Sequence, residues 1–115
     1  MKTRVSIEGL QFFAYHGFYD EERKQGNDFV CDVQVELKSF DSMEDNIYDT
    51  VNYEDIYRIV EEEMKITRKL IETVAFNIIE KIKLLNHVTG AMVKISKIRP
   101  QLDGKVDRAV VEMKF

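Results

Sequence analysis

The clearest pattern in the chain is an alternation of apolar and largely polar positions from Phe29 to Lys38. Every odd-numbered position as far as Leu37 is apolar. Because successive side chains of a strand point to opposite faces, this period of two predicts a strand with one buried face. The opposite face is either solvated or lines a channel, since it carries the polar residues Asp32, Gln34 and Glu36.

A second alternating segment runs from Arg4 to Gly17 and changes phase at Gly9. The apolar positions are odd-numbered before this glycine, whereas Leu10 and Phe12 are the apolar positions after it. A phase change at a glycine within a strand predicts a β-bulge or a bend. The polar segment from Tyr15 to Asn27 is typical of a loop, so we expect the two strands to form a hairpin.

Two helices are predicted after an acidic, irregular stretch from Ser39 to Thr50, which has room for one helical turn. Asn52 is suited to cap the first helix, with Asp55 in its first turn. Apolar residues at helical spacing continue from Ile56 to Met64. The second helix carries an apolar stripe formed by Ile71, Val74, Ala75, Ile78, Ile79, Ile82 and Leu85.

Two further strands are predicted at Val88 to Ile98 and at Val106 to Phe115. The order of elements predicts a single α+β domain over residues 1–115, an antiparallel four-stranded sheet with both helices on one face. Each outer strand of such a sheet has one edge without a partner strand. Unpaired edges favour association between copies of the chain, so we expect a homo-oligomer.

Composition narrows the range of functions. The chain has 115 residues, a net charge of −4 and no cluster of Lys and Arg, which argues against nucleic-acid binding. No apolar run approaches the ~20 residues of a membrane helix, and the N-terminus has no apolar signal-peptide core. The lone cysteine, Cys31, cannot form an intrachain disulfide, and we expect a cytoplasmic protein that does not bind membranes.

Familiar catalytic signatures are missing from the sequence. It has neither a Gly-rich phosphate-binding loop nor a nucleophile elbow. His16, His87 and Cys31 are too few to build a Cys/His zinc site within one chain. Chemistry without a metal or a cofactor is therefore the expectation.

Two charged residues each have two interpretations. Lys97 is in phase with Val93 and Ile95, which puts it on the apolar face, where burial lowers the pKa of a lysine. Alternatively, the strand has ended and Lys97 extends into water. Glu72 lies in the first turn of the second helix, where it either stabilises the helix N-terminus or binds paired N–H donors of a ligand. The residues alone favour the plainer interpretation in both cases.

Three other residues have a plain interpretation when each is taken singly. Tyr53 follows the predicted N-cap directly and is typical of a surface aromatic. Glu22 lies in a charged stretch that is typical of a solvated cluster. His16, next to Gly17, is typical of a hydrogen-bonded structural histidine.

Read together, four blocks form one pattern along nearly the whole chain. They are Gly9 to Gly17 followed by Glu22 and Gly26-Asn27, then Asp49 to Tyr53, then Leu70 to Ala75, and last Val93 to Lys97. These blocks resemble the signatures of dihydroneopterin aldolases. The resemblance implies a tunnelling fold, in which subunits join their sheets into a tetrameric ring, often stacked as an octamer, with active sites between subunits. It also implies retro-aldol cleavage of 7,8-dihydroneopterin in folate synthesis.

The resemblance also implies roles for single residues. Glu72 would accept hydrogen bonds from the 2-amino group and the adjacent ring N–H of the pterin. Lys97 would organise proton transfer near N5 and the side-chain hydroxyl, and Glu22 would contact the glycol chain or orient a water. Tyr53, from the neighbouring subunit, would protonate or deprotonate the intermediate. Backbone groups would line the pterin pocket around Val51, Asn52, Leu70 and Ile71.

The chain departs from the family pattern at two places. Residues 98–104 follow Lys97 where relatives often have a more proline-rich loop, and Asn52 stands where histidine is frequent. Two alternatives to the aldolase stay open. One is dihydroneopterin triphosphate epimerase, for which Arg99 could hold a phosphate, and the other is a pterin-binding protein without catalysis.

Overall fold

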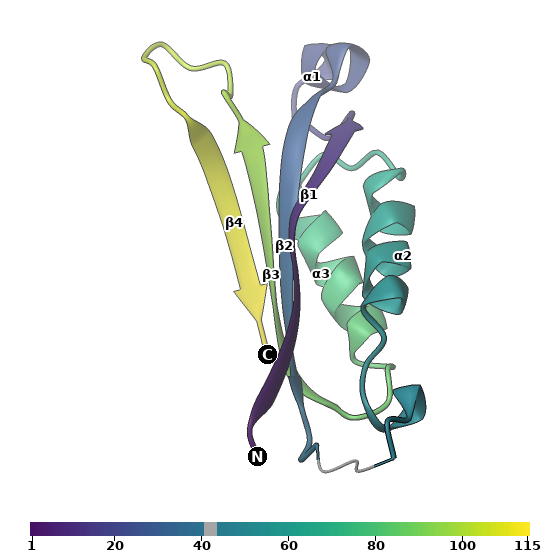
Figure 1. Ribbon diagram of the computed structural model, residues 1–115. Helices are drawn as coiled ribbons and strands as arrows, with labels where there is room; N and C mark the ends of the chain where they lie inside the picture. The colour runs from purple at the N-terminus through teal and green to yellow at the C-terminus, as the bar shows by residue number, and fades with distance from the viewer. Residues whose placement is uncertain (41–43) are drawn as a thin grey trace.

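Four antiparallel strands form one sheet in the order β1-β2-β3-β4, so that strands adjacent in sequence are adjacent in space (Figure 1). The computed structural model describes residues 1–40 and 44–115. The strands are β1 (Thr3–Ala14), β2 (Asn27–Leu37), β3 (Val88–Ile98) and β4 (Arg108–Lys114). β1 and β4 are the two edges of the sheet. The predicted sheet is confirmed, although the first and last strands are shorter than expected.

The predicted bulge in β1 is present. Ile7 pairs with Val33, but the next pair joins Leu10 to Cys31, so β1 holds one residue more than β2 between these pairs. Gly9 takes a φ of +69°, a value that favours glycine. Its N–H donates to the Asp32 carboxylate at 2.8 Å, which satisfies the backbone group freed by the bulge.

Two helices, α2 (Tyr53–Met64) and α3 (Ile71–Ile82), cover one face of the sheet (Figure 1). The Asn52 side chain caps α2 by accepting the Glu54 N–H at 2.9 Å, as predicted. The apolar residues of both helices pack on the odd-numbered residues of β2. All five predicted inward residues of that strand are buried, namely Phe29, Cys31, Val33, Val35 and Leu37.

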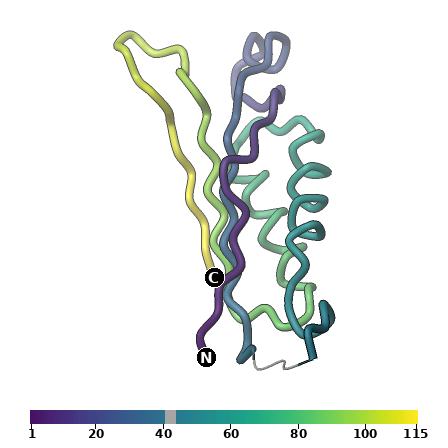
Figure 2. The backbone as a smooth tube through the Cα atoms, in the orientation of Figure 1, coloured from purple at the N-terminus to yellow at the C-terminus, as the bar shows by residue number. Residues whose placement is uncertain are grey.

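The segment predicted as a loop between β1 and β2 contains a short helix, α1 (Asp20–Gln25). Its first turn is acidic and its last turn carries Arg23 and Lys24, a charge order that suits the helix dipole. The expected helical turn before α2 is η1 (Ile47–Asp49), and residues 41–43 of that stretch lie outside the described residues. The tube in Figure 2 traces the bend of β1 and the loop that joins β3 to β4.

Candidate active site

The candidate site residues lie at two opposite ends of an elongated molecule that measures 54 Å along its longest axis. Lys97 is at the end of β3 and Glu22 is in α1, at the upper end of Figure 1. Tyr53 begins α2 at the lower end, close to η1. A hydrogen bond of 2.8 Å between His87 and the Tyr48 carbonyl ties η1 to the start of β3. One copy of the chain therefore does not bring all the candidates together.

At the upper end, the Lys97 ammonium pairs with the Glu22 carboxylate. Lys97 lies opposite Phe29 in the ladder between β2 and β3, and its side chain is only 12% exposed. The phase argument thus placed Lys97 correctly, and the alternative of a solvated strand end is wrong. Burial lowers the pKa of Lys97 below the usual lysine value, while the adjacent carboxylate favours its charged form.

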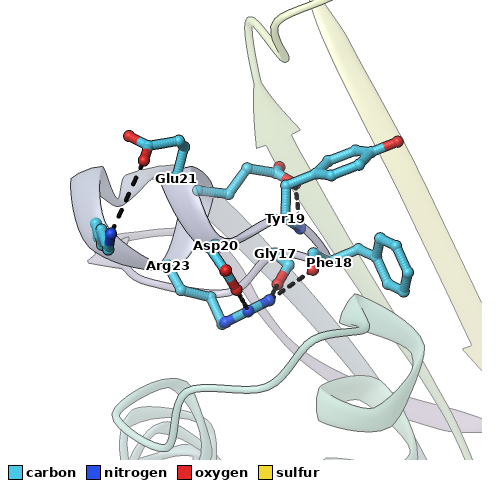
Figure 3. A network of polar contacts seen from close by, with 8 residues as sticks. Gly17, Phe18, Tyr19, Asp20, Glu21 and Arg23 are labelled. Carbon is cyan, nitrogen blue, oxygen red and sulfur yellow. Dashed lines mark hydrogen bonds and ion pairs between the residues drawn. The ribbon is translucent and has the colours of Figure 1, made fainter.

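Glu22 reaches Lys97 because the chain before α1 is held tightly. The other oxygen of Glu22 accepts the Tyr19 N–H at 3.2 Å, so the carboxylate has two partners. Its side chain folds over Gly17, where an added Cβ would lie 2.9 Å from the Glu22 carboxyl carbon. Figure 3 shows Arg23 reaching back from α1 to the Gly17 and Phe18 carbonyls, at 2.7 and 2.6 Å, and to the Asp20 carboxylate.

These contacts correct the view of Glu22 as part of a solvated cluster. The charge order from Asp20 to Lys24 is the sequence signal that could have revealed α1. Gly17, which precedes α1, is required because the Glu22 side chain packs closely against it. A pattern of apolar and polar residues does not reveal such a contact. Gly17 and Arg23 are thus residues of the site that sequence reasoning missed.

Leu70, Ile71 and Glu72 lie at the N-terminus of α3. Leu70 occupies the N-cap position and is 48% exposed. Glu72 is exposed in the first turn, and within residues 1–40 and 44–115 no side chain pairs with its carboxylate. Four N–H groups at a helix start lack partners within the helix, so this carboxylate is held beside a positive dipole end with its oxygens accessible.

At the lower end, Val51 is buried, Asn52 caps α2 and Tyr53 is 60% exposed. The phenol of Tyr53 thus faces outward, away from the core of its own chain. A surface pocket of about 420 Å³ lies beside these residues, between η1, the start of α2 and residues 84–86. Neither Lys97 nor Glu72 lines it, so the two ends remain separate within one chain.

The described part of the chain offers neither a cluster of metal ligands nor a membrane-spanning helix. It contains no group of three or more His, Cys, Asp or Glu side chains placed to hold a metal ion. His16 lies near the upper end, whereas His87 lies beside η1 at the lower end. In the same residues, no helix is long and apolar enough to cross a membrane.

The FolB dihydroneopterin aldolase family model matches residues 5–114, which is nearly the whole chain. The chain belongs to the dihydroneopterin aldolase family. Within this family, the enzyme of Staphylococcus epidermidis is 31% identical over 116 residues, which cover 98% of this chain and 96% of that one. The family predicted from the four sequence blocks is confirmed.

Solved structures of dihydroneopterin aldolases share the fold. The enzyme of Escherichia coli, in complex with neopterin, has a TM-score of 0.75 at 24% identity, with coverage of 96% of this chain and 98% of that chain. A Burkholderia enzyme bound to guanine has a TM-score of 0.81 at 17% identity, with coverage of 99% and 90%. At these identities the likeness concerns the fold alone, and it confirms the predicted arrangement of strands and helices.

Proposed function

We propose that this chain cleaves 7,8-dihydroneopterin by a retro-aldol reaction, giving 6-hydroxymethyl-7,8-dihydropterin and glycolaldehyde for folate synthesis. The observation that most supports this proposal is the half-buried ion pair of Lys97 and Glu22, which lies at the same end of the molecule as the exposed Glu72. The complex of the Escherichia coli relative with neopterin supports a pterin as the substrate.

The proposal requires no cofactor, because the substrate itself contains the group that accepts electrons. Its N5=C6 imine accepts the electron pair released when the side-chain C1′–C2′ bond breaks. The protein then has three tasks: to hold the ring, to remove the proton of the 2′-hydroxyl, and to return a proton to C1′. Each task is within reach of an ionisable side chain, so we expect neither a metal nor a Schiff-base lysine to take part.

Lys97 and Glu22 suit the proton-transfer steps. Burial lowers the pKa of Lys97, so its neutral amine is more accessible near neutral pH than that of a surface lysine. Glu22 is held by Tyr19 and Lys97, in a position to orient the substrate's glycol chain or a water. Glu72 would accept the two N–H groups of the pterin edge, with backbone groups around Leu70 and Ile71 beside the ring.

Replacing Gly17 with alanine should displace Glu22 from Lys97 and lower kcat/KM for dihydroneopterin by about tenfold or more. The added Cβ would approach the Glu22 side chain within 2.9 Å of its carboxyl carbon. Steady-state kinetics check this expectation, and thermal unfolding tests whether the fold survives. Gly104→Ala is the matched control, because a Cβ there meets nothing within 4 Å. Equal kinetics for the two variants would contradict the role given to Glu22.

We further propose that the active site is completed by a second copy of the chain, which supplies Tyr53, Val51 and Asn52. Two observations support this assembly: Tyr53 is exposed at the end of the molecule opposite Lys97, and among the described residues the outer edges of β1 and β4 have no partner strand. A ring closed through these edges is the arrangement that the family resemblance implies, as a tetramer or a stacked octamer. The lone cysteine fits a location in the cytoplasm.

Two inactive variants should restore activity when they are coexpressed. Tyr53→Phe and Lys97→Ala each remove one half of every site, and each alone should have little turnover. In a mixed ring, about a quarter of the interfaces would join an intact Lys97 to an intact Tyr53, so about a quarter of wild-type activity should return. The control is coexpression of Tyr48→Phe with Lys97→Ala, which removes the phenol of a different tyrosine and leaves that of Tyr53 in place. No recovery from a confirmed mixed oligomer would contradict the shared site.

Incubation of chelator-treated protein with 7,8-dihydroneopterin tests the reaction itself. We expect 6-hydroxymethyl-7,8-dihydropterin and glycolaldehyde in equal amounts. Formation of only the stereoisomer at C2′ would favour the epimerase, which releases no aldehyde. Binding of neopterin without turnover would favour a pterin-binding protein. Activity that is lost with the chelator and restored by a metal would contradict the metal-free mechanism.

A further inference from the structure

His16 makes a contact that the proposed reaction does not use. Its side chain is buried, at 1% exposure, and its Nδ1 accepts the backbone N–H of Arg68 at 3.2 Å. The next residue, Gly17, donates its own N–H to the Arg68 carbonyl at 3.0 Å. Two consecutive residues therefore hold both backbone polar groups of Arg68, across 52 positions of sequence.

This double contact joins the two parts of the upper end of the site. Arg68 precedes Leu70, the N-cap residue of α3, by two positions, and Glu72 lies in the first turn of that helix. On the other side, Gly17 is the residue over which Glu22 folds toward Lys97. A displacement of the connection between α2 and α3 would thus change the distance from Glu72 to the pair of Lys97 and Glu22.

The chemistry of the contact suits a neutral imidazole. Burial and the nearby Arg68 charge both lower the pKa of His16, which leaves Nδ1 unprotonated and able to accept a hydrogen bond from the Arg68 N–H. The ring packs edge-on against Phe29, with centroids 5.4 Å apart, and Phe29 is the residue opposite Lys97 in the sheet. The imidazole is therefore fixed on the same part of the core as the catalytic lysine.

We propose that His16 is a positioning residue for pterin binding: through the Arg68 amide it sets the place of Leu70 and Glu72 relative to Lys97 and Glu22. The proposal rests on the proposed function, because it takes Glu72 as the pterin anchor. His16 itself touches no substrate. It acts through the backbone of the connection between α2 and α3, which carries the pterin-binding residues at its end.

Two substitutions at His16 distinguish the role of the hydrogen-bond acceptor from the role of the ring's volume. His16→Asn keeps an acceptor near the position of Nδ1, whereas His16→Leu fills a similar space without one. We expect His16→Leu to raise KM for dihydroneopterin by about tenfold or more, with a smaller change in kcat, because the Lys97 pair is retained. His16→Asn should keep KM within about threefold of wild type. If His16→Leu does not fold, His16→Gln replaces it, since its longer amide leaves the Nδ1 position empty.

Hydrogen exchange of the segment 65–70 is the readout that does not depend on the reaction. It should be faster in His16→Leu than in wild type and unchanged in His16→Asn. Val60→Ala, a core change in α2, controls for lost stability: it should leave KM at its wild-type value, and any faster exchange should extend along α2 rather than be confined to residues 65–70. The proposal is overturned if His16→Leu leaves KM and exchange unchanged, or if His16→Asn is impaired equally. If wild-type protein does not cleave dihydroneopterin, the proposed function fails, and exchange alone then decides whether His16 positions the segment.

Discussion

Replacing Lys97 with alanine should lower kcat for dihydroneopterin cleavage by about 10²–10⁴-fold, the range expected for loss of a general acid or base. Affinity for neopterin should change by only a few-fold, because the ring is held elsewhere. The expectation follows from the pairing of a half-buried lysine with Glu22, which places an ionisable amine in a position shielded from water. Single-turnover kinetics together with a neopterin binding curve measure the two quantities separately.

Lys94 offers a matched control for this substitution. It lies three residues earlier on β3, on the opposite face of the sheet, and pairs in register with Asp32 and Glu112. Lys94→Ala removes the same charge from the same strand but should retain wild-type turnover. If Lys97→Ala turned over dihydroneopterin as fast as Lys94→Ala, the lysine would have no part in proton transfer. A loss of neopterin affinity equal to the loss of turnover would instead assign Lys97 to binding.

The fold could be predicted from the sequence because most elements bury a single face. The alternation from Phe29 to Leu37 and the apolar stripe that begins at Ile71 both indicate which side chains are removed from water. The structure buries these residues, except that Ile71 and Leu85 are only partly buried and Leu85 lies beyond the end of α3. α1 escaped prediction for the same reason. It buries no residue, and its stability comes from charge order and from Arg23 contacts with backbone carbonyls.

The candidate site could be predicted only in part. The phase of β3 was enough to place Lys97 on the inner face, since that depends on the strand alone. The partner of Lys97 depends on how the chain turns between β1 and α1, where Gly17 allows Glu22 to fold back. Within the part of the chain that the structure describes, Tyr53 begins α2 at the end of the molecule opposite this region, so its proposed role comes from the family resemblance and from a second copy.

Replacing Glu72 with alanine should weaken neopterin binding by about 100-fold or more, which corresponds to about 3 kcal/mol. Two N–H donors of the pterin edge would lose a charged acceptor, and hydrogen bonds to a charged group are the stronger kind. The proposed catalytic pair of Lys97 and Glu22 is retained, so kcat at saturating substrate should fall much less than affinity. Isothermal titration with neopterin and steady-state kinetics measure the two effects.

Glu80→Ala is the matched control, because Glu80 is also exposed on α3 and pairs only with Lys83 among the described residues. The plainer role of Glu72, stabilisation of the helix N-terminus, is worth about 0.3–1 kcal/mol and affects unfolding rather than binding. A small loss of thermal stability with unchanged neopterin affinity would therefore show that Glu72 serves only its helix. The role of Glu72 as the pterin anchor requires that both variants fold and that only Glu72→Ala loses affinity for neopterin.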